Sequence, residues 1–405
     1  STSSSRQSRV SSRSTSKPIS NSLTSSQITS VVEAATAAVT AASLDSSEDL
    51  IQIMPKIIEG SQGKLATVGL SNSSETIKVI NVIANSLVKS INGRSDKLPS
   101  ASAESGSTAT ETVLSKITST SVANLDEAGL SSTDIGTASS ELVGTVVGSL
   151  GSGGLSSSEL GGALDKITAG AVGSLDQITG YSVSSLGDAI DNITSGATAA
   201  LGDITVTGFS ADDLTTMVEK VTSGATSALG NISMTGYSSD NLSSMVEKVT
   251  SGATSALGKI EMTGYSSDNI TSMTSTITTS TTDSLGKITM AGFDKDNIPS
   301  DITNSVTTGS NAGILLQPPM VKEITVVTTP TKDNTPSYTF KSSKAGTITY
   351  GVGCSSDNTS ATADNNTSTF TALSDGTYSN CTLYVTSSTG VKGDTLSVTS
   401  FTVDT

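Results

Sequence analysis

A unit of 28 residues occurs twice in succession and dominates the sequence. Residues 208–235, GFSADDLTTMVEKVTSGATSALGNISMT, are followed directly by residues 236–263, GYSSDNLSSMVEKVTSGATSALGKIEMT. The opening glycine recurs at Gly264 and Gly292, and earlier at Gly180. A repeat of this length is typical of proteins in which small units stack on their neighbours as a solenoid. The pattern therefore says more about shape than about biochemical role.

Each unit predicts one amphipathic helix of roughly five turns, because its apolar residues recur at steps of three and four. In the second copy these residues are Leu242, Met245, Val246, Val249, Ala253, Ala256, Leu257 and Ile260. The tail of the unit, residues 260–265, alternates apolar and polar residues and is either a short strand or an extended loop. A strand would make a β/α-solenoid. We favour the loop and an α-solenoid, because the earlier units are shorter and lack this tail.

The predicted helix start is the same in each unit. A polar residue has the place of an N-cap, which satisfies a free N–H of the first turn. Apolar residues before and after it have the spacing of a hydrophobic staple, and an acidic residue in the first turn suits the helix dipole. The predicted staple and cap residues are Phe209, Ser210 and Leu214; Tyr237, Ser238 and Leu242; Tyr265, Ser266 and Ile270; and Phe293, Asp294 and Ile298.

Glycine occurs in the middle of these predicted helices. Gly224 and Gly252 should each cost about 1 kcal/mol relative to alanine in a helix interior. We interpret them as points where neighbouring helices approach closely. The alternative is a break in the helix at the glycine.

Composition divides the chain into five segments. We predict a basic, Ser-rich leader (residues 1–20), an N-terminal helical region that caps the array (21–108), the helical repeat array with units of about 25–28 residues (109–308), a linker (309–320) and a β domain (321–405).

The two N-terminal segments carry further expectations. Residues 22–43 and 74–92 have helical periodicity, and Pro55 should end or kink the helix between them. The leader has four basic and no acidic residues. It is either a tether near an anionic membrane surface, beside a lipid anchor left by signal-peptide processing, or a plain solvated leader.

The β domain is predicted from short Thr- and Val-rich runs between Gly, Asn and Asp turns. The runs begin at Glu323, Ser337, Thr347, Thr369, Thr382 and Leu396. Residues 335–340 (TPSYTF), 345–351 (AGTITYG) and 373–381 (LSDGTYSNC) resemble the bacterial immunoglobulin-like repeats of large secreted and cell-surface proteins. The resemblance covers residues 321–405. It implies an immunoglobulin-like β-sandwich that serves as a stalk or adhesive spacer without catalysis.

This sequence departs from antibody-type domains in two respects. Cys381 lies three residues after Tyr378 rather than two, and the chain has no tryptophan. A sugar-binding role is therefore not carried over from the resemblance.

The two cysteines, Cys354 and Cys381, are predicted to form a disulfide. Cys354 shares strand parity with Ile348 and Val352, and Cys381 shares it with Leu383, so both should point into the sandwich. A disulfide implies an oxidising compartment. The alternative is a pair of buried free thiols.

Composition argues against several functions. Histidine is absent and the net charge is −15, which removes the usual general base and argues against a nucleic-acid partner. The sequence has no nucleotide-binding or paired-cysteine metal motif, and no apolar run long enough to cross a membrane. Asp294, Asp296 and Asn297 offer oxygen ligands for Ca²⁺, although helix capping alone explains these residues.

These observations predict a non-enzymatic structural protein, without a cofactor, that is secreted to a bacterial surface. We expect it to form a homo-oligomer or polymer through the repeat array, as in a filament, sheath or surface layer. The alternative is a monomeric adhesin or surface lipoprotein that binds a glycan or protein on the solenoid face or the immunoglobulin-like domain.

Overall fold

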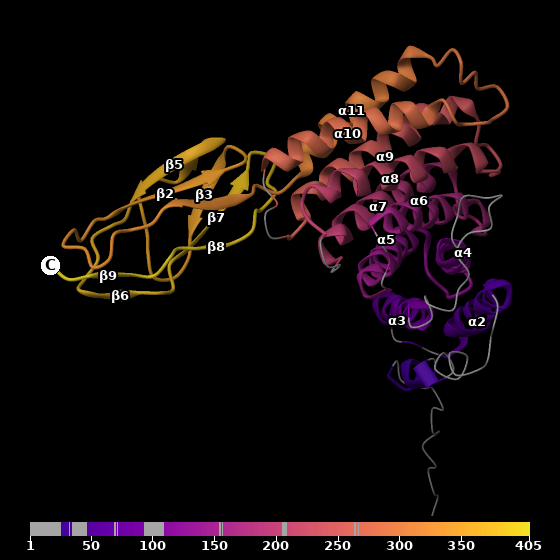
Figure 1. Ribbon diagram of the computed structural model, residues 1–405, viewed down its shortest axis with the longest axis horizontal. Helices are drawn as coiled ribbons and strands as arrows, with labels where there is room; N and C mark the ends of the chain where they lie inside the picture. The colour runs from indigo at the N-terminus through magenta and orange to yellow at the C-terminus, as the bar shows by residue number, and fades with distance from the viewer. Residues whose placement is uncertain are drawn as a thin grey trace, which may run out of the picture.

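The computed structural model of this protein has a helical region followed by a region of antiparallel strands (Figure 1). The predicted division into an α part and a β part is therefore confirmed. The structure describes residues 26–31, 33–34, 47–68, 70, 72–92, 109–153, 155, 157–204, 209–262, 265 and 267–405.

Each repeat unit supplies one long helix. The helices are α2 (Ser47–Val68), α3 (Ser73–Asn92), α4 (Ala109–Ala123), α5 (Ser132–Gly148), α6 (Ser157–Gly173), α7 (Val183–Ala199), α8 (Asp213–Ala228), α9 (Leu242–Ala256), α10 (Ser267–Leu285) and α11 (Ser300–Leu316). Residues 26–31 and 33–34 are also helical, and short 3-10 turns such as Leu229–Asn231 follow several of the long helices. The tail residues 232–234 and 260–262 form no strand.

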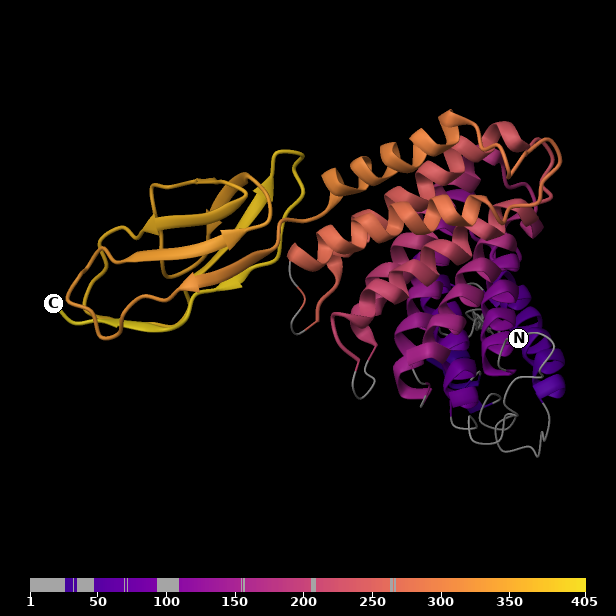
Figure 2. The ribbon, with the colours of Figure 1, turned by 45° about the horizontal axis from the view of Figure 1, so that its top comes forward.

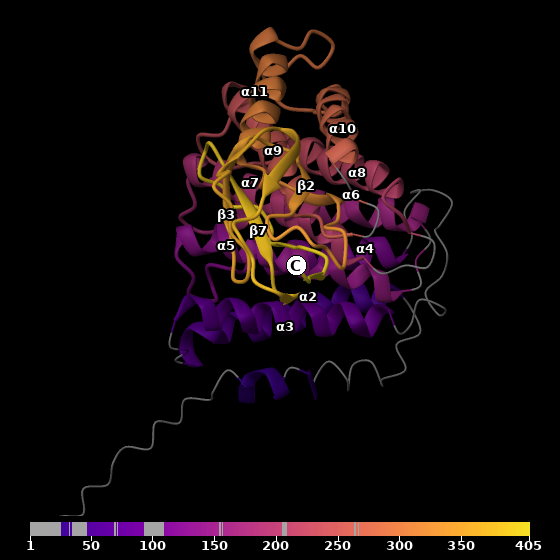
Figure 3. The same cartoon turned by 90° about the vertical axis from the view of Figure 1, so that its left-hand side faces the viewer.

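The helices pack in two rows, because each long helix lies mainly against the helices two positions away in the chain. One row contains α2, α4, α6, α8 and α10, and the other contains α3, α5, α7, α9 and α11 (Figures 1 and 3). Two successive units thus add one helix to each row. α2 and α3 continue the rows in the same way, so the predicted boundary between a separate N-terminal region and the array at residue 109 has no counterpart in the packing.

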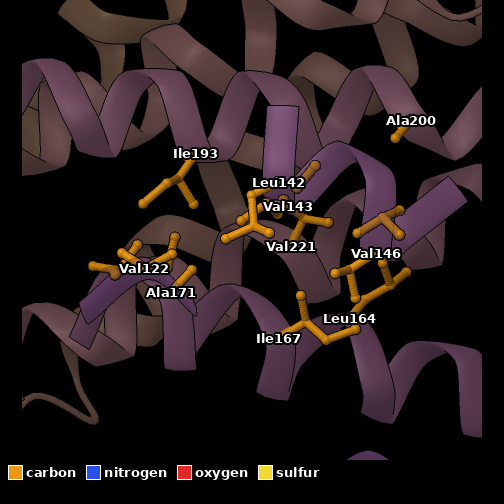
Figure 4. Close-up of a cluster of buried hydrophobic side chains, with 14 of the residues drawn as sticks. Val122, Leu142, Val143, Val146, Leu164, Ile167, Ala171, Ile193, Ala200 and Val221 are labelled. Atoms are coloured by element: carbon orange, nitrogen blue, oxygen red, sulfur yellow. The ribbon is translucent and has the colours of Figure 1, made fainter. Parts of the chain in front are cut away.

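An apolar core lies between the two rows. Figure 4 shows one part of it, where Leu142 and Val146 of α5 meet Leu164 and Ile167 of α6. All four side chains are fully buried, as is Ile193 of α7. Burying such a side chain contributes about 1.5–3 kcal/mol. The apolar residues that recur at steps of three and four in the sequence therefore form the helix faces that pack between the two rows.

Glycines permit close contact within a row. A Cβ on Gly224 of α8 would lie 2.3 Å from the carbonyl oxygen of Asp165 in α6, and one on Gly252 of α9 would lie 2.3 Å from that of Asp191 in α7. Both helices continue through their glycine. The interpretation as close-approach points is confirmed, and the alternative of a helix break is wrong.

The contact recurs along the molecule with one instructive exception. A Cβ on Gly309 of α11 would lie 2.3 Å from the carbonyl oxygen of Glu247 in α9. In α10 the equivalent residue is Ser280, which instead donates its hydroxyl to the carbonyl oxygen of Glu219 in α8 (2.9 Å). Each position thus places either no side chain or a hydrogen-bond donor against the neighbouring backbone.

Three predicted boundaries in the helical region need correction. Pro55 does not end its helix, since α2 continues to Val68. The predicted linker 309–320 is mostly helix, because α11 runs to Leu316. Asp294 does not cap a helix, because α11 begins only at Ser300, after Pro299. A helix that began at Asp294 would place Pro299 in its second turn, where a backbone N–H is needed, whereas at the N-cap of α11 Pro299 breaks no helix hydrogen bond.

The β region projects from the end of the stack that holds α10 and α11 (Figures 1 and 2). Its strands are β1 (Val321–Thr325), β2 (Ser337–Ser342), β3 (Gly346–Tyr350), β4 (Ser360–Ala361), β5 (Asp364–Thr369), β6 (Gly376–Tyr378), β7 (Thr382–Ser387), β8 (Leu396–Ser397) and β9 (Phe401–Val403). One sheet has the order β1-β2-β5 and another has the order β4-β3-β7-β8, while β6 pairs with β9. All of these pairs are antiparallel.

Two strand predictions are wrong. The run from Thr369 is not a strand, because β5 ends at that residue and Phe370 is buried just beyond it. Val352 does not point inward; it is 78 % exposed, since β3 ends at Tyr350 and the chain turns at Gly353 with φ +102°. Strand parity fails once the strand ends.

Candidate functional site

The four predicted aromatic staple residues all pack against the helical core as half-buried side chains: Phe209, Tyr237, Tyr265 and Phe293. Leu214 and Leu242 are fully buried, whereas Ile270 and Ile298 are half-buried at the core edge. Ser266 lies outside the described residues. The staple positions therefore serve packing within and between units.

At Ser210 and Ser238 the backbone N–H is bonded by a side chain three residues later in the chain. The backbone N–H of Ser210 donates to Asp213 (2.8 Å), and that of Ser238 donates to Asn241 (2.9 Å). The long helices begin later, at Asp213 and Leu242. Asp294 instead accepts from the backbone N–H of Asp296 (3.1 Å) in a turn.

Two tyrosine hydroxyls have a role that sequence analysis missed. Tyr237 donates to the carbonyl oxygen of Leu229 (3.1 Å), and Tyr265 donates to that of Leu257 (2.7 Å). Each bond adds a donor to a carbonyl at the end of the preceding helix, where fewer backbone donors are present. Burial raises the pKa of both tyrosines. The sequence contained a signal for these bonds, because each tyrosine follows its leucine by eight residues in both units.

Two half-buried aspartates lie at the contacts between helices of one row. Burial raises the pKa of Asp165 and of Asp191, against the opposing effect of nearby lysines. Asp188, one turn before Asp191, forms an ion pair with Lys248 of α9 (2.9 Å). The ion pair of Asp188 with Lys248 thus ties α7 to α9 within one row.

A groove opens on the row that contains α5 and α7. It encloses about 600 Å³ and is lined by small residues, among them Gly144, Gly148 and Gly196. Charged residues complete the lining: Glu141, Asp203, Lys259 and Glu261. Because all four are exposed, the groove is an open, net acidic surface that suits a polar or cationic ligand. We define this feature as the α5/α7 groove.

The junction between the helical and β regions is a second candidate surface. Lys344, in the turn between β2 and β3, donates its ammonium to the carbonyl oxygens of Ile314 and Gln317 at the end of α11. Thr389 donates to the carbonyl oxygen of Leu315 (3.0 Å). A cation at the C-terminus of a helix is favourable both for the free carbonyls and for the helix dipole.

Replacing Lys344 with methionine is expected to loosen the β region from the stack while leaving each part folded. Methionine keeps the apolar stem but removes the charge that satisfies two carbonyls. Small-angle X-ray scattering should show a broader distribution of molecular dimensions for Lys344→Met than for the wild type. Lys341→Met, a matched change on an outward-facing residue of β2, should leave the scattering unchanged. Identical scattering from all three proteins would show that the Lys344 contact does not hold the β region against α11.

The two cysteines lie at disulfide distance. Cys354 and Cys381 have Cα atoms 5.1 Å apart, and both are buried. The pair links the chain after β3 to the residue before β7, within the core of the β region.

Reduction of this pair is expected to destabilise the β region by roughly 3–4 kcal/mol, from the entropy of a closed loop of this length. Denaturant unfolding with and without a reductant would measure the loss. Mass spectrometry after alkylation provides the check, because labelling of two thiols in the unreduced native protein would show that no bond exists.

Within the described residues, no group of three or more acidic or cysteine side chains is placed to hold a metal ion. Asp296, one of the residues considered for Ca²⁺, lies 3.3 Å from the ammonium of Lys295. Among the helices of the described ranges, none combines the length and apolar character needed to cross a membrane.

Comparison with protein-family models and with curated protein sequences finds no match for this chain. Functional inference therefore depends on the packing, the groove and the junction.

Proposed function

We propose that this chain is a non-enzymatic structural protein of a bacterial surface, in which a stiff helical solenoid carries an immunoglobulin-like module. The observation that carries the proposal is the glycine–carbonyl contact repeated from α6 to α8, from α7 to α9 and from α9 to α11. Backbones in close contact at several steps of both rows resist bending, and an elongated array of such steps is a suitable spacer or building block.

The assignment of the β region to an immunoglobulin-like sandwich is supported by its connectivity and by one tyrosine. A three-stranded sheet and a four-stranded sheet share a core of aromatic residues. Thr331 forms a parallel bridge with Val403 of the last strand. The hydroxyl of Tyr378 donates to the carbonyl oxygen of Ser374, four residues upstream (2.9 Å), as in the tyrosine corner of immunoglobulin-like folds.

The proposed extracellular location rests on the cysteine pair, because disulfides persist in oxidising compartments. The proposed work of the protein is assembly into a filament, sheath or surface layer. The outer face of α10 presents Thr271, Ser275, Thr279 and Thr282 as exposed residues. A polar face is what the end of a capped repeat array needs, so contacts between copies would use other surfaces than this face of α10.

The test is the size of the purified protein over a wide concentration range. Light scattering coupled to gel filtration should give masses that grow with concentration, and electron microscopy should show regular polymers. A protein that remains a monomer at every concentration would rule out self-assembly.

The second candidate is a monomeric adhesin, which the α5/α7 groove favours. A groove lined by glycine and carboxylates admits a polar ligand such as a glycan. Binding to a glycan array should then be lost in Thr145→Arg, which fills the groove from its lining, and kept in Thr279→Arg on α10. Equal binding by both variants would exclude the groove as the ligand site.

A further inference from the structure

We propose that the α5/α7 groove binds the basic leader, residues 1–20, of a second copy of the chain. This inference rests on the proposed self-assembly and names the contact that would drive it. The leader lies outside the described residues and is characterised by its sequence alone.

The groove has an excess of negative charge and of hydrogen-bond acceptors. Glu141, Asp203 and Glu261 line it, and Lys259 is the single cation among its lining residues. Asn81 of α3 donates its amide N–H to Glu141 (3.0 Å), which orients that carboxylate in the groove. A ligand rich in N–H donors and positive charge fits this lining.

Small residues make the groove accessible to a polypeptide. Gly144 of α5 and Gly196 of α7 lie against each other, and a Cβ on Gly144 would be 3.4 Å from the carbonyl oxygen of Gly196. These glycines bring α5 and α7 together, so half-buried helix backbone forms part of the lining between the carboxylates. Arginine binds carboxylates through two parallel hydrogen bonds, which adds orientation to the charge attraction.

The leader has the complementary composition. Arg6, Arg9, Arg13 and Lys17 are its charged residues, spaced by three, four and four, and the first acidic residue of the chain is Glu33. The net charge of the whole chain is −15, so the leader is a positive segment on an otherwise strongly negative protein. Its remaining residues are mainly Ser and Thr, which are small enough to lie over the glycines.

A contact between the leader and the α5/α7 groove joins two different surfaces of the chain. Such a heterologous contact repeats from copy to copy and produces an open chain unless the rotation closes a ring. The contact should weaken as salt rises, since exposed charges are screened.

Direct binding tests the contact. The probe is a fluorescent peptide of residues 1–20, and the receptor is the full chain with Arg6→Gln, Arg9→Gln, Arg13→Gln and Lys17→Gln, which prevents its own leader from competing. We expect saturable binding that weakens at least tenfold when Glu141→Gln, Asp203→Asn and Glu261→Gln are added.

A matched control distinguishes the groove from the overall charge. Asp240→Asn, Asp357→Asn and Asp394→Asn remove the same charge from exposed residues elsewhere and should change the affinity less than twofold. Equal losses in both triple variants would overturn the inference, because binding would then follow net charge alone. Circular dichroism of each variant shows that it is folded.

Mixing tests whether the leader acts between copies. Neither the full-length leader variant nor the full-length groove variant should polymerise alone, but an equal mixture should form dimers, since one copy supplies the leader and the other the groove. Wild-type protein that stays monomeric at every concentration although the peptide binds the leader variant would place the leader in the groove of its own copy and overturn the inference. Polymers of wild-type protein without any peptide binding would also overturn it, while the proposed function would stand.

Discussion

Gly252→Ala is expected to destabilise the helical region by about 1–3 kcal/mol, the usual cost of overpacking a tight site. The new Cβ would lie 2.3 Å from both the carbonyl oxygen of Asp191 and the hydroxyl oxygen of Thr194. The carbonyl belongs to α7 and cannot move without shifting that helix. This clash outweighs the gain of about 1 kcal/mol that alanine brings to a helix interior. Denaturant unfolding followed by circular dichroism at the helical band measures the change.

The same substitution at Gly60 should have the opposite sign. Gly60 is exposed in the interior of α2, and a Cβ there would meet no atom within 4 Å. Gly60→Ala should therefore stabilise the protein by up to about 1 kcal/mol through helix propensity alone. If both variants gained stability, the glycines of the repeat would be tolerated defects rather than contacts, and the stiffness on which the proposed function depends would have no basis.

The helical region was predictable because its signals are periodic. Apolar steps of three and four give the helices, and Gly224 and Gly252 give the contact positions. The pairing of alternate helices was not predictable, since every unit has the same stripe and nothing in it says which neighbour it meets. α11 was partly missed because Gly309, Gly313 and the following prolines have the composition of a linker. Gly309 in fact has the place of Gly252 two units later.

The β region shows where local patterns mislead. β5 has the sequence DNNTST, with no alternation of apolar residues. It forms by pairing along its whole length with β2. The amide of its buried Asn366 is satisfied locally, because the N–H₂ group donates to the carbonyl oxygens of Thr362 and Asp364 at 3.0 and 2.7 Å. A polar side chain that replaces an apolar one in the core leaves no periodic trace in the sequence.

The candidate surfaces depend on contacts between distant segments and were not predictable. Glu141 of α5 and Glu261 after α9 line one groove only because alternate helices share a row. Lys344 reaches the end of α11 only because that helix runs to Leu316 rather than ending before Gly309. By contrast, the partnership of Cys354 and Cys381 was expected from strand parity, and the two residues lie at disulfide distance.

Phe370→Ala is expected to remove about 3–5 kcal/mol of stability from the β region, the usual cost of deleting a buried phenylalanine ring. Phe370 is in the middle of a stacked row of rings, 5.9 Å from Tyr338 and 6.0 Å from Phe401 between centroids. The row spans the core between strands that are distant in sequence, because Tyr338 is in β2 and Phe401 is in β9. Loss of the central ring leaves a cavity that its neighbours cannot fill without leaving their own strands.

Hydrogen exchange read by mass spectrometry would show where that loss falls. Peptides from β2, β7 and β9 should exchange faster in Phe370→Ala, while peptides from α5 to α9 should keep wild-type rates, because the two apolar cores share no residues. Val352→Ala is the control, since that side chain is 78 % exposed. This substitution should change the exchange rates of neither set of peptides. Faster exchange in both regions of Phe370→Ala would mean that the β region and the stack unfold as one cooperative unit. The module would then be an integral end of the rod rather than a separate domain carried on it.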